Sequence, residues 1–165
     1  MNDVSQHVFF DSGSVVWDVR SSSKYEAIRE IIHRSPVLGS INKLDPEEFA
    51  EIVIQREKLQ TTGFGHGVAV AHGRSPAIED SEITLGVSKE GIDYDAVDGH
   101  PVHLLFIVAN HPDKQMDYLT ILSSLVSLVR HASFREELLS CMCQEEIEEK
   151  LSSAFHRVIR DRTIA

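Results

Sequence analysis

The sequence is poor in cysteine and in long apolar runs, and each shortage excludes a class of protein. Its 165 residues include two cysteines, Cys141 and Cys143, which are too close together for an ordinary disulfide and have no companions for a zinc site. We expect both to be reduced thiols, as is usual in the cytoplasm. No apolar run approaches the roughly 20 residues of a membrane-spanning helix, and we expect no signal peptide.

Basic residues are also scarce, since 16 lysines and arginines face 26 acidic residues and the net charge is −10. The basic residues form no cluster, so we expect neither nucleic acid nor a membrane as a partner. A partner with a basic face would suit this charge, although solubility alone explains it. The length and the ordinary apolar content predict a single domain over residues 1–165, with residues 1–14 and 159–165 at its periphery.

The motifs of several catalytic classes are missing as well. A G-x-G-x-x-G nucleotide fingerprint would need glycine where Val68 stands, and a helix where we expect a strand. There is no Walker lysine and no G-x-S-x-G nucleophile elbow. His100 and His103 have a spacing that can chelate a metal, but no H-E-x-x-H motif or cysteine pair accompanies them. We therefore expect no metal and no cofactor.

The residues that are present predict covered strands alternating with amphipathic helices. This alternation indicates an α/β protein, with one sheet and helices on both of its faces, although the strand order does not follow from it. Asp45 before a proline and two glutamates is a strong helix start. The expected strands cover residues 15–19, 68–72, 83–88 and 102–109, and the expected helices cover 24–34, 45–58, 114–131, 134–142 and 144–158.

The most informative stretch is T-T-G-F-G-H-G-V-A-V-A-H-G, residues 61–73. Its loop glycines (Gly63, Gly65 and Gly67) permit positive φ angles and close approach to another molecule. The short strand that follows ends at His72, which shares a face with Val68 and Val70 and so points inward or along a cleft wall. This place suits a reactive nitrogen, but a core histidine bonded to a backbone carbonyl would give the same pattern.

Arg56 lies at the end of the helix that leads into this loop. It continues the apolar face formed by Phe49, Ile52 and Val53, which aims its guanidinium at the neighbourhood of His72. An arginine that merely complements the helix C-terminus is an equally good interpretation. Together these residues favour a histidine that accepts a phosphoryl group, since Arg56 and the loop amides offer donors for the phosphoryl oxygens.

Residues 55–73 also carry the pattern Q-R-E-x-x-x-T-T-G-x-G-x-G-x-A-x-A-H-G, which resembles the R-E-x-x-x-T-G-x-G-x-G-x-A-x-P-H-G signature of phosphotransferase-system IIA domains of the fructose/mannitol type. The segment Y-D-A-V-D-G-H-P-V at 94–102, the strand after it and a Y-L-x-x-L helix agree too, so the resemblance extends from about Ser23 to Leu151. It is nearest to the stand-alone nitrogen-regulatory branch, because these residues include no transporter or carrier domain. The fold that it implies is a three-layer α/β/α sandwich with a mixed sheet.

The resemblance assigns roles to particular residues. The phosphorylated histidine of the family, which takes its phosphate from an HPr-like phosphocarrier, corresponds to His72, and the family arginine corresponds to Arg56. Ala71 replaces the family proline, and Tyr118 stands where the family has a second histidine. Tyr118 can donate a hydrogen bond to phosphate or be an ordinary aromatic of the helix stripe. Two other histidines are weaker candidates for phosphate contact, namely His66 in the loop and His111, which can replace the lost imidazole or lie at the surface.

The function favoured by the resemblance is that of a cytoplasmic bacterial regulatory IIA protein. Phosphorylation of His72 would control its binding to target proteins. One alternative is a IIA subunit that passes phosphate to a separate sugar-specific IIB, and another is an interaction module that has lost phosphotransfer. The sequence leaves open the partner or sugar, the oligomeric state, the phosphorylated ring nitrogen, and whether Tyr118 abolishes onward transfer.

Overall fold

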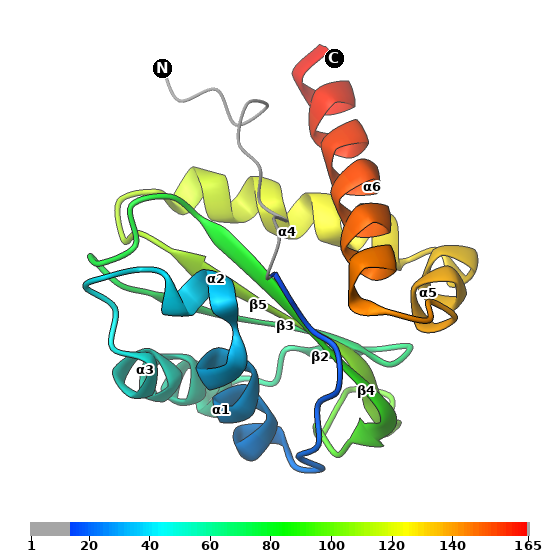
Figure 1. Ribbon diagram of the computed structural model, residues 1–165, viewed down its shortest axis with the longest axis horizontal. Coiled ribbons are helices and arrows are strands. Elements are labelled where there is room, and N and C mark those ends of the chain that lie inside the picture. The colour runs from blue at the N-terminus through cyan, green and yellow to red at the C-terminus, as the bar shows by residue number, and fades with distance from the viewer. Residues whose placement is uncertain (1–13, 165) are drawn as a thin grey trace.

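The computed structural model describes the backbone of residues 14–164, which form one mixed sheet between layers of helices (Figure 1). Residues 1–13, most of the segment that we expected at the N-terminal periphery, lie outside this range. The strand order is β1 (Val15–Val16), β4 (Glu82–Ile92), β5 (Val102–Asn110), β3 (Val68–Arg74) and β2 (Gly63–Gly65). β4 runs antiparallel to β5, β3 runs parallel to β5, and β2 is an antiparallel edge strand on β3.

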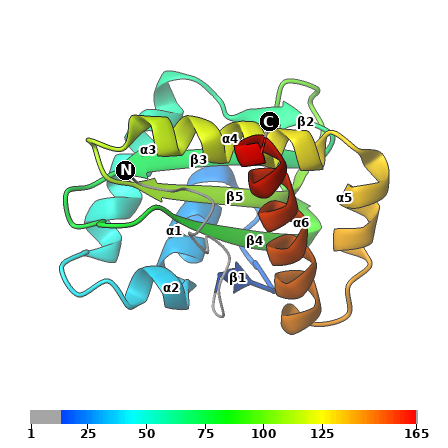
Figure 2. The same ribbon diagram turned by 90° about the horizontal axis from the view of Figure 1, so that it is seen from above.

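Helices cover both faces of the sheet, as Figure 2 shows from above, and this confirms the predicted three-layer architecture. Because successive side chains of a strand alternate between faces, Ala69 and Ala71 of β3 pack on one helix layer and Val68 and Val70 on the other. The first layer contains α1 (Lys24–Arg34), α2 (Pro36–Gly39) and α3 (Pro46–Leu59); the second contains α4 (Gln115–Val129), α5 (Ala132–Leu139) and α6 (Gln144–Ile164). None of the helices in the described part of the chain is long and apolar enough to cross a membrane.

Several sequence-based boundaries were wrong. Pro36 starts the short helix α2 instead of only ending α1, because the Ser35 hydroxyl caps Leu38 and proline fits the first helical position. Residues 63–65 pair with β3 as β2, although we expected an unpaired loop. The last helix continues to Ile164 and buries Ile159 in the core, so the C-terminal periphery does not begin at residue 159.

The sheet leaves His72 at an open edge. β2 pairs with β3 only at Val68 and Ala69, so no described strand covers the outer side of β3 at His72. Helix α3 packs closely beside this part of β3. A β-carbon at Gly73 would lie 2.7 Å from Val53 Cγ2 and 3.0 Å from Phe49 Cε1. The glycine after His72 therefore allows α3, which carries Arg56, to approach the strand.

We expect Gly73→Ala to destabilise the protein by about 1–3 kcal/mol, because the added methyl group overpacks the contact with α3. Urea denaturation measures the loss. Gly39→Ala is the matched control, since a β-carbon at Gly39 meets nothing within 4 Å and the backbone there does not need a positive φ. Equal unfolding free energies for the two variants would contradict the close packing of α3 on Gly73.

Candidate functional site

His72 lines a cavity of about 440 Å³ at this open edge of the sheet. Three elements build it: the end of β3 supplies His72 and Arg74, the last turns of α3 supply Arg56, and the first turn of α4 supplies Tyr118. The full lining is Ile52, Arg56, His72, Gly73, Arg74, Gln115 and Tyr118. Although the His72 residue is only 7% exposed, it forms part of the wall of a cavity.

Tyr118 fixes the orientation of the His72 ring. The two rings stack with their centroids 4.3 Å apart and their planes inclined by 26°. The Tyr118 hydroxyl also lies 3.2 Å from His72 Nδ1, within hydrogen-bond distance. Both contacts are with the imidazole of His72 itself. Tyr118 is therefore more than an ordinary aromatic of the helix stripe, the second of the two roles considered for it. Of the two ring nitrogens, Nδ1 is the one held by Tyr118.

Two arginines and burial keep the His72 ring neutral. Burial is the largest cause, and the positive charges of Arg56 and Arg74 add to it, so the pKa of His72 falls from 6.5 to about 4. Burial also raises the pKa of Tyr118 above its ordinary value, against the opposing effect of the same two arginines. At neutral pH both groups are therefore uncharged, and the positive charge of the cavity comes from Arg56 and Arg74.

We expect a pH titration of the His72 ring, followed by NMR of its Cε1–H group, to have its midpoint near 4. Because the folded pKa lies below the ordinary value, the unfolded chain binds the proton more readily between pH 6.5 and 4. The stability that the neutral ring contributes is thus complete above about pH 6.5 and is lost as the pH falls towards 4. A midpoint near 6.5 would show that burial and the arginines do not act on this ring as the geometry requires.

The glycine loop lies away from this cavity. The loop residues that we proposed as phosphate ligands are Gly63, Gly65, His66 and Gly67, and none of them lines it. The His66 backbone, at a φ of 58°, donates its N–H to Asp98 Oδ2 at 2.9 Å. His72 follows Gly67 by five positions of extended chain, about 16 Å at roughly 3.3 Å per residue. The geometry therefore does not support phosphate contacts by the loop at His72; the loop instead packs on residues 94–103.

Of the two other predicted site residues, Arg56 lines the cavity and His111 does not. Arg56 lines the cavity as expected, although it is exposed and does not continue the buried face of α3. His111 follows β5 at the same end of the sheet, but its Nδ1 accepts the N–H of Asp113 at 3.0 Å and the residue is not part of the cavity wall. His111 therefore does not replace the second histidine of the family in this structure.

Sequence reasoning missed Arg74 and Gln115. Arg74 is two residues after His72 on the same strand, so the period of two that placed His72 also places Arg74 on its face. We had ended the strand at His72, and this boundary error hid the second cation. Gln115 begins α4, and only the packing of α4 on the sheet brings it to the cavity.

Sequence reasoning also missed the role of Glu57, which holds the end of α3 in place. Its side chain is buried and accepts hydrogen bonds from the Thr62 N–H at 2.8 Å and the Thr62 hydroxyl at 2.7 Å. Lys24 Nζ lies 3.3 Å from the same carboxylate. The R-E pair of the sequence thus combines a cavity arginine, Arg56, with a buried carboxylate that anchors the turn behind it.

Comparison with known proteins agrees with this architecture. Residues 8–154 match the family described as phosphoenolpyruvate-dependent sugar phosphotransferase system, EIIA 2. A solved relative, the nitrogen regulatory protein IIA-Ntr from Neisseria meningitidis, has 30% sequence identity and a TM-score of 0.76, covering 86% of this chain and 94% of its own. IIA mannitol of Escherichia coli, solved in a complex with phosphorylated IIB mannitol, is 20% identical with a TM-score of 0.71, covers 87% of this chain and 96% of its own, and shows the fold alone.

A fructose-specific EIIABC component from Bacillus subtilis is 30% identical over 130 residues, which are 79% of this chain and 20% of that protein. The chain thus spans about a fifth of the length of this relative. The fold is that of the IIA proteins of the phosphotransferase system. The chain belongs to the EIIA type 2 family, the fructose/mannitol type, as the sequence resemblance indicated.

Proposed function

We propose that this protein is a phosphoacceptor of the phosphotransferase system, in which His72 takes a phosphoryl group from an HPr-like phosphocarrier and the phosphorylated state controls binding to target proteins. The observation that carries the proposal is the neutral His72 ring on the wall of an open cavity that also contains Arg56 and Arg74. A neutral imidazole has the lone pair that attacks phosphorus, and the guanidinium groups stabilise the charge of the transferred group. Because the proposed donor is a cytoplasmic carrier, the reaction takes place in the cytoplasm.

We infer the reacting nitrogen from the contact between His72 and Tyr118. We assign the Nδ1 proton as the donor to the Tyr118 oxygen at 3.2 Å, which leaves the lone pair of the neutral ring on Nε2. In the transfer, a bond forms between Nε2 and phosphorus while the nitrogen–phosphorus bond of the carrier breaks. The carrier imidazole leaves with the electron pair of that bond. Tyr118 acts as a positioning residue here, since it stacks on the ring and contacts its Nδ1 atom.

The arginines and the strand edge supply donors for the phosphoryl oxygens. Arg56 and Arg74 reach the cavity from two different elements, so they can contact different oxygens of one phosphoryl group. Val70 donates its N–H to Thr62 on the β2 side, whereas Ser75 donates to Asn110 on the β5 side. Alternate backbone groups of a strand point the same way, so the N–H groups of His72 and Arg74 point to the open edge. We assign to these two amides the hydrogen bonds to phosphate that we had expected from the glycine loop.

Labelling with radioactive phosphoenolpyruvate, enzyme I and an HPr-like carrier tests the proposal. We expect one phosphoryl group per chain that is labile in acid and stable in alkali, as for a nitrogen–phosphorus bond, and that maps to the peptide containing residues 68–74. Phosphorus NMR of the product should show the Nε2 isomer. Absence of label with several such carriers would favour the interaction module without phosphotransfer. A label on another histidine would assign the phosphoacceptor role to that residue instead of His72.

Transfer to a sugar-specific IIB is a second candidate function. It is favoured by the 30% identity to a fructose-specific EIIABC component over 79% of this chain. The presence of Tyr118 in place of the second family histidine weighs for the regulatory function, because a phenol with a raised pKa is a far weaker proton donor than a histidine. Reconstitution with a fructose-type IIB domain separates the two: rapid loss of label to IIB would establish the transferring function.

A further inference from the structure

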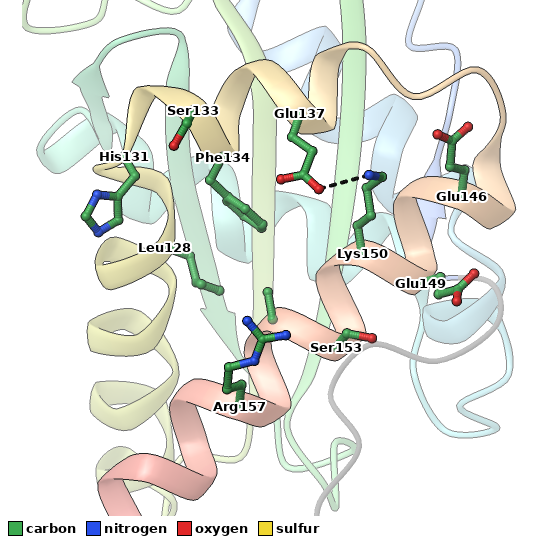
Figure 3. Close-up of a pocket in the computed structure, with 11 residues that line it drawn as sticks. Leu128, His131, Ser133, Phe134, Glu137, Glu146, Glu149, Lys150, Ser153 and Arg157 are labelled. Atoms are coloured by element: carbon green, nitrogen blue, oxygen red, sulfur yellow. Dashed lines mark hydrogen bonds and ion pairs between the residues drawn. The ribbon is translucent and has the colours of Figure 1, made fainter.

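A second cavity, of about 610 Å³, lies between α5 and α6 (Figure 3). Its apolar part includes Leu128 and Phe134, which pack against the core and are only partly buried. In Figure 3 the ring of Phe134 and the guanidinium of Arg157 both point into the space between the helices. Leu128 follows Tyr118 by ten positions on α4, a rise of about 15 Å, so this groove is remote from His72.

Charge is distributed unevenly along the groove. Glu146 and Glu149 line it in the first two turns of α6, and Arg157 lines it further along the same helix. Arg157 follows Glu146 by eleven positions, a rise of about 16 Å, which is the length of three helical turns. One end of the groove is thus negative and the other positive.

An ion pair crosses the negative end. Lys150 Nζ on α6 lies 2.9 Å from Glu137 Oε1 on α5, and the two side chains are 33% and 52% exposed. Ion pairs exposed to this degree contribute little to stability. A cation from a partner can therefore replace Lys150 at Glu137 without unfolding either helix. Apolar surface continues next to this end, because Leu139 and Met142 at the α5–α6 turn are 38% and 82% exposed.

We propose that the groove between α5 and α6 binds a short amphipathic helix of a partner protein, with basic residues in its first turn. The positive N-terminal end of such a helix, reinforced by its basic residues, lies against Glu146 and Glu149, and its negative C-terminal end lies against Arg157. Its apolar side chains lie over Leu128 and Phe134, the usual way in which a helix occupies a groove. Charge complementarity along three turns thus specifies both the kind of partner and its direction.

This surface is separate from the proposed phosphoacceptor site. About 15 Å exceeds the Debye length of roughly 8 Å at physiological salt, so phosphorylation of His72 changes the potential at the groove little. A partner bound here stays bound in both phosphorylation states. The groove then holds the partner in either state, and the His72 cavity remains accessible to the carrier.

A synthetic peptide of about four helical turns tests the proposal, with leucines on one face, lysines in the first turn and glutamates in the last. It is titrated into the ¹⁵N-labelled full chain and followed by chemical shifts. We expect the shifts to gather around Leu128, Phe134, Ser153 and Arg157, and a peptide with its charges exchanged end for end to bind more weakly. Shifts spread over the acidic surface, or absent from the groove, would overturn the proposal.

Variants separate the groove from general attraction to an acidic protein. Glu149→Lys should weaken peptide binding about tenfold, whereas Glu90→Lys, an equal charge change at an exposed position on β4, should not. Ser153→Trp fills the groove from an exposed position without changing charge and should also prevent binding. Equal weakening by Glu149→Lys and Glu90→Lys would contradict the assignment. His72→Gln leaves peptide affinity unchanged, so this result does not depend on the proposed phosphotransfer.

Discussion

His72→Gln should abolish phosphorylation by an HPr-like carrier, lowering the labelling rate by at least about a thousandfold. Glutamine keeps a polar, uncharged side chain at this position, but it has no nitrogen that can form a stable bond with phosphorus. Because the ring is at the end of β3 and beside a cavity, the core residues on either side of the sheet keep their packing. The rate is measured with labelled phosphoenolpyruvate and catalytic amounts of enzyme I and carrier.

His111→Gln is the matched control for this variant. His111 is at the same end of the sheet and was a candidate for phosphate contact, but it does not line the cavity. We expect the control to be labelled at the wild-type rate. Equal labelling of His72→Gln and the wild type would refute the phosphoacceptor assignment, and loss of label in His111→Gln alone would transfer it to His111. Circular dichroism establishes that each variant is folded.

The layered fold could be predicted because local signals and packing agree in most of the chain. The helix after Asp45 begins where its cap, proline and acidic first turn place it. β2 could not be predicted in the same way, since its glycines have low strand propensity and its pairing depends on the edge of β3. The strand order likewise depends on which edges meet, and no periodicity within one strand contains this information.

The site shows the same division between local and tertiary information. His72 and Arg56 were predicted from a motif, and the cavity brings them together, although Arg56 is exposed and does not lie on the buried face of α3. The glycine loop was assigned to the same site because it is near His72 in sequence, yet an extended strand carries neighbours in sequence far apart in space. The contact between Tyr118 and the His72 ring joins two elements 46 residues apart, which only the packing of α4 on the sheet determines.

Replacing Arg74, the cation that the sequence did not reveal, has the second largest expected effect. We expect Arg74→Ala and Arg56→Ala each to slow phosphorylation about a hundredfold, because each removes a charged donor near the transferred group. The double variant should lose more than either single one. Arg160→Ala on α6, which removes an exposed arginine outside the cavity, is the matched control and should react at the wild-type rate.

The ionisation of His72 distinguishes an electrostatic role of Arg74 from a structural one. Both arginines lower the pKa of His72, so removal of either should raise it from about 4 towards 6.5, and Arg74→Lys should restore most of the depression by keeping the charge. NMR titration of the ring measures this shift independently of any carrier. A slow variant whose His72 pKa stays near 4 would mean that Arg74 does not act on the ring through its charge. A raised pKa with an unchanged rate would mean instead that phosphate is held by other donors, such as the backbone amides at the open edge of β3.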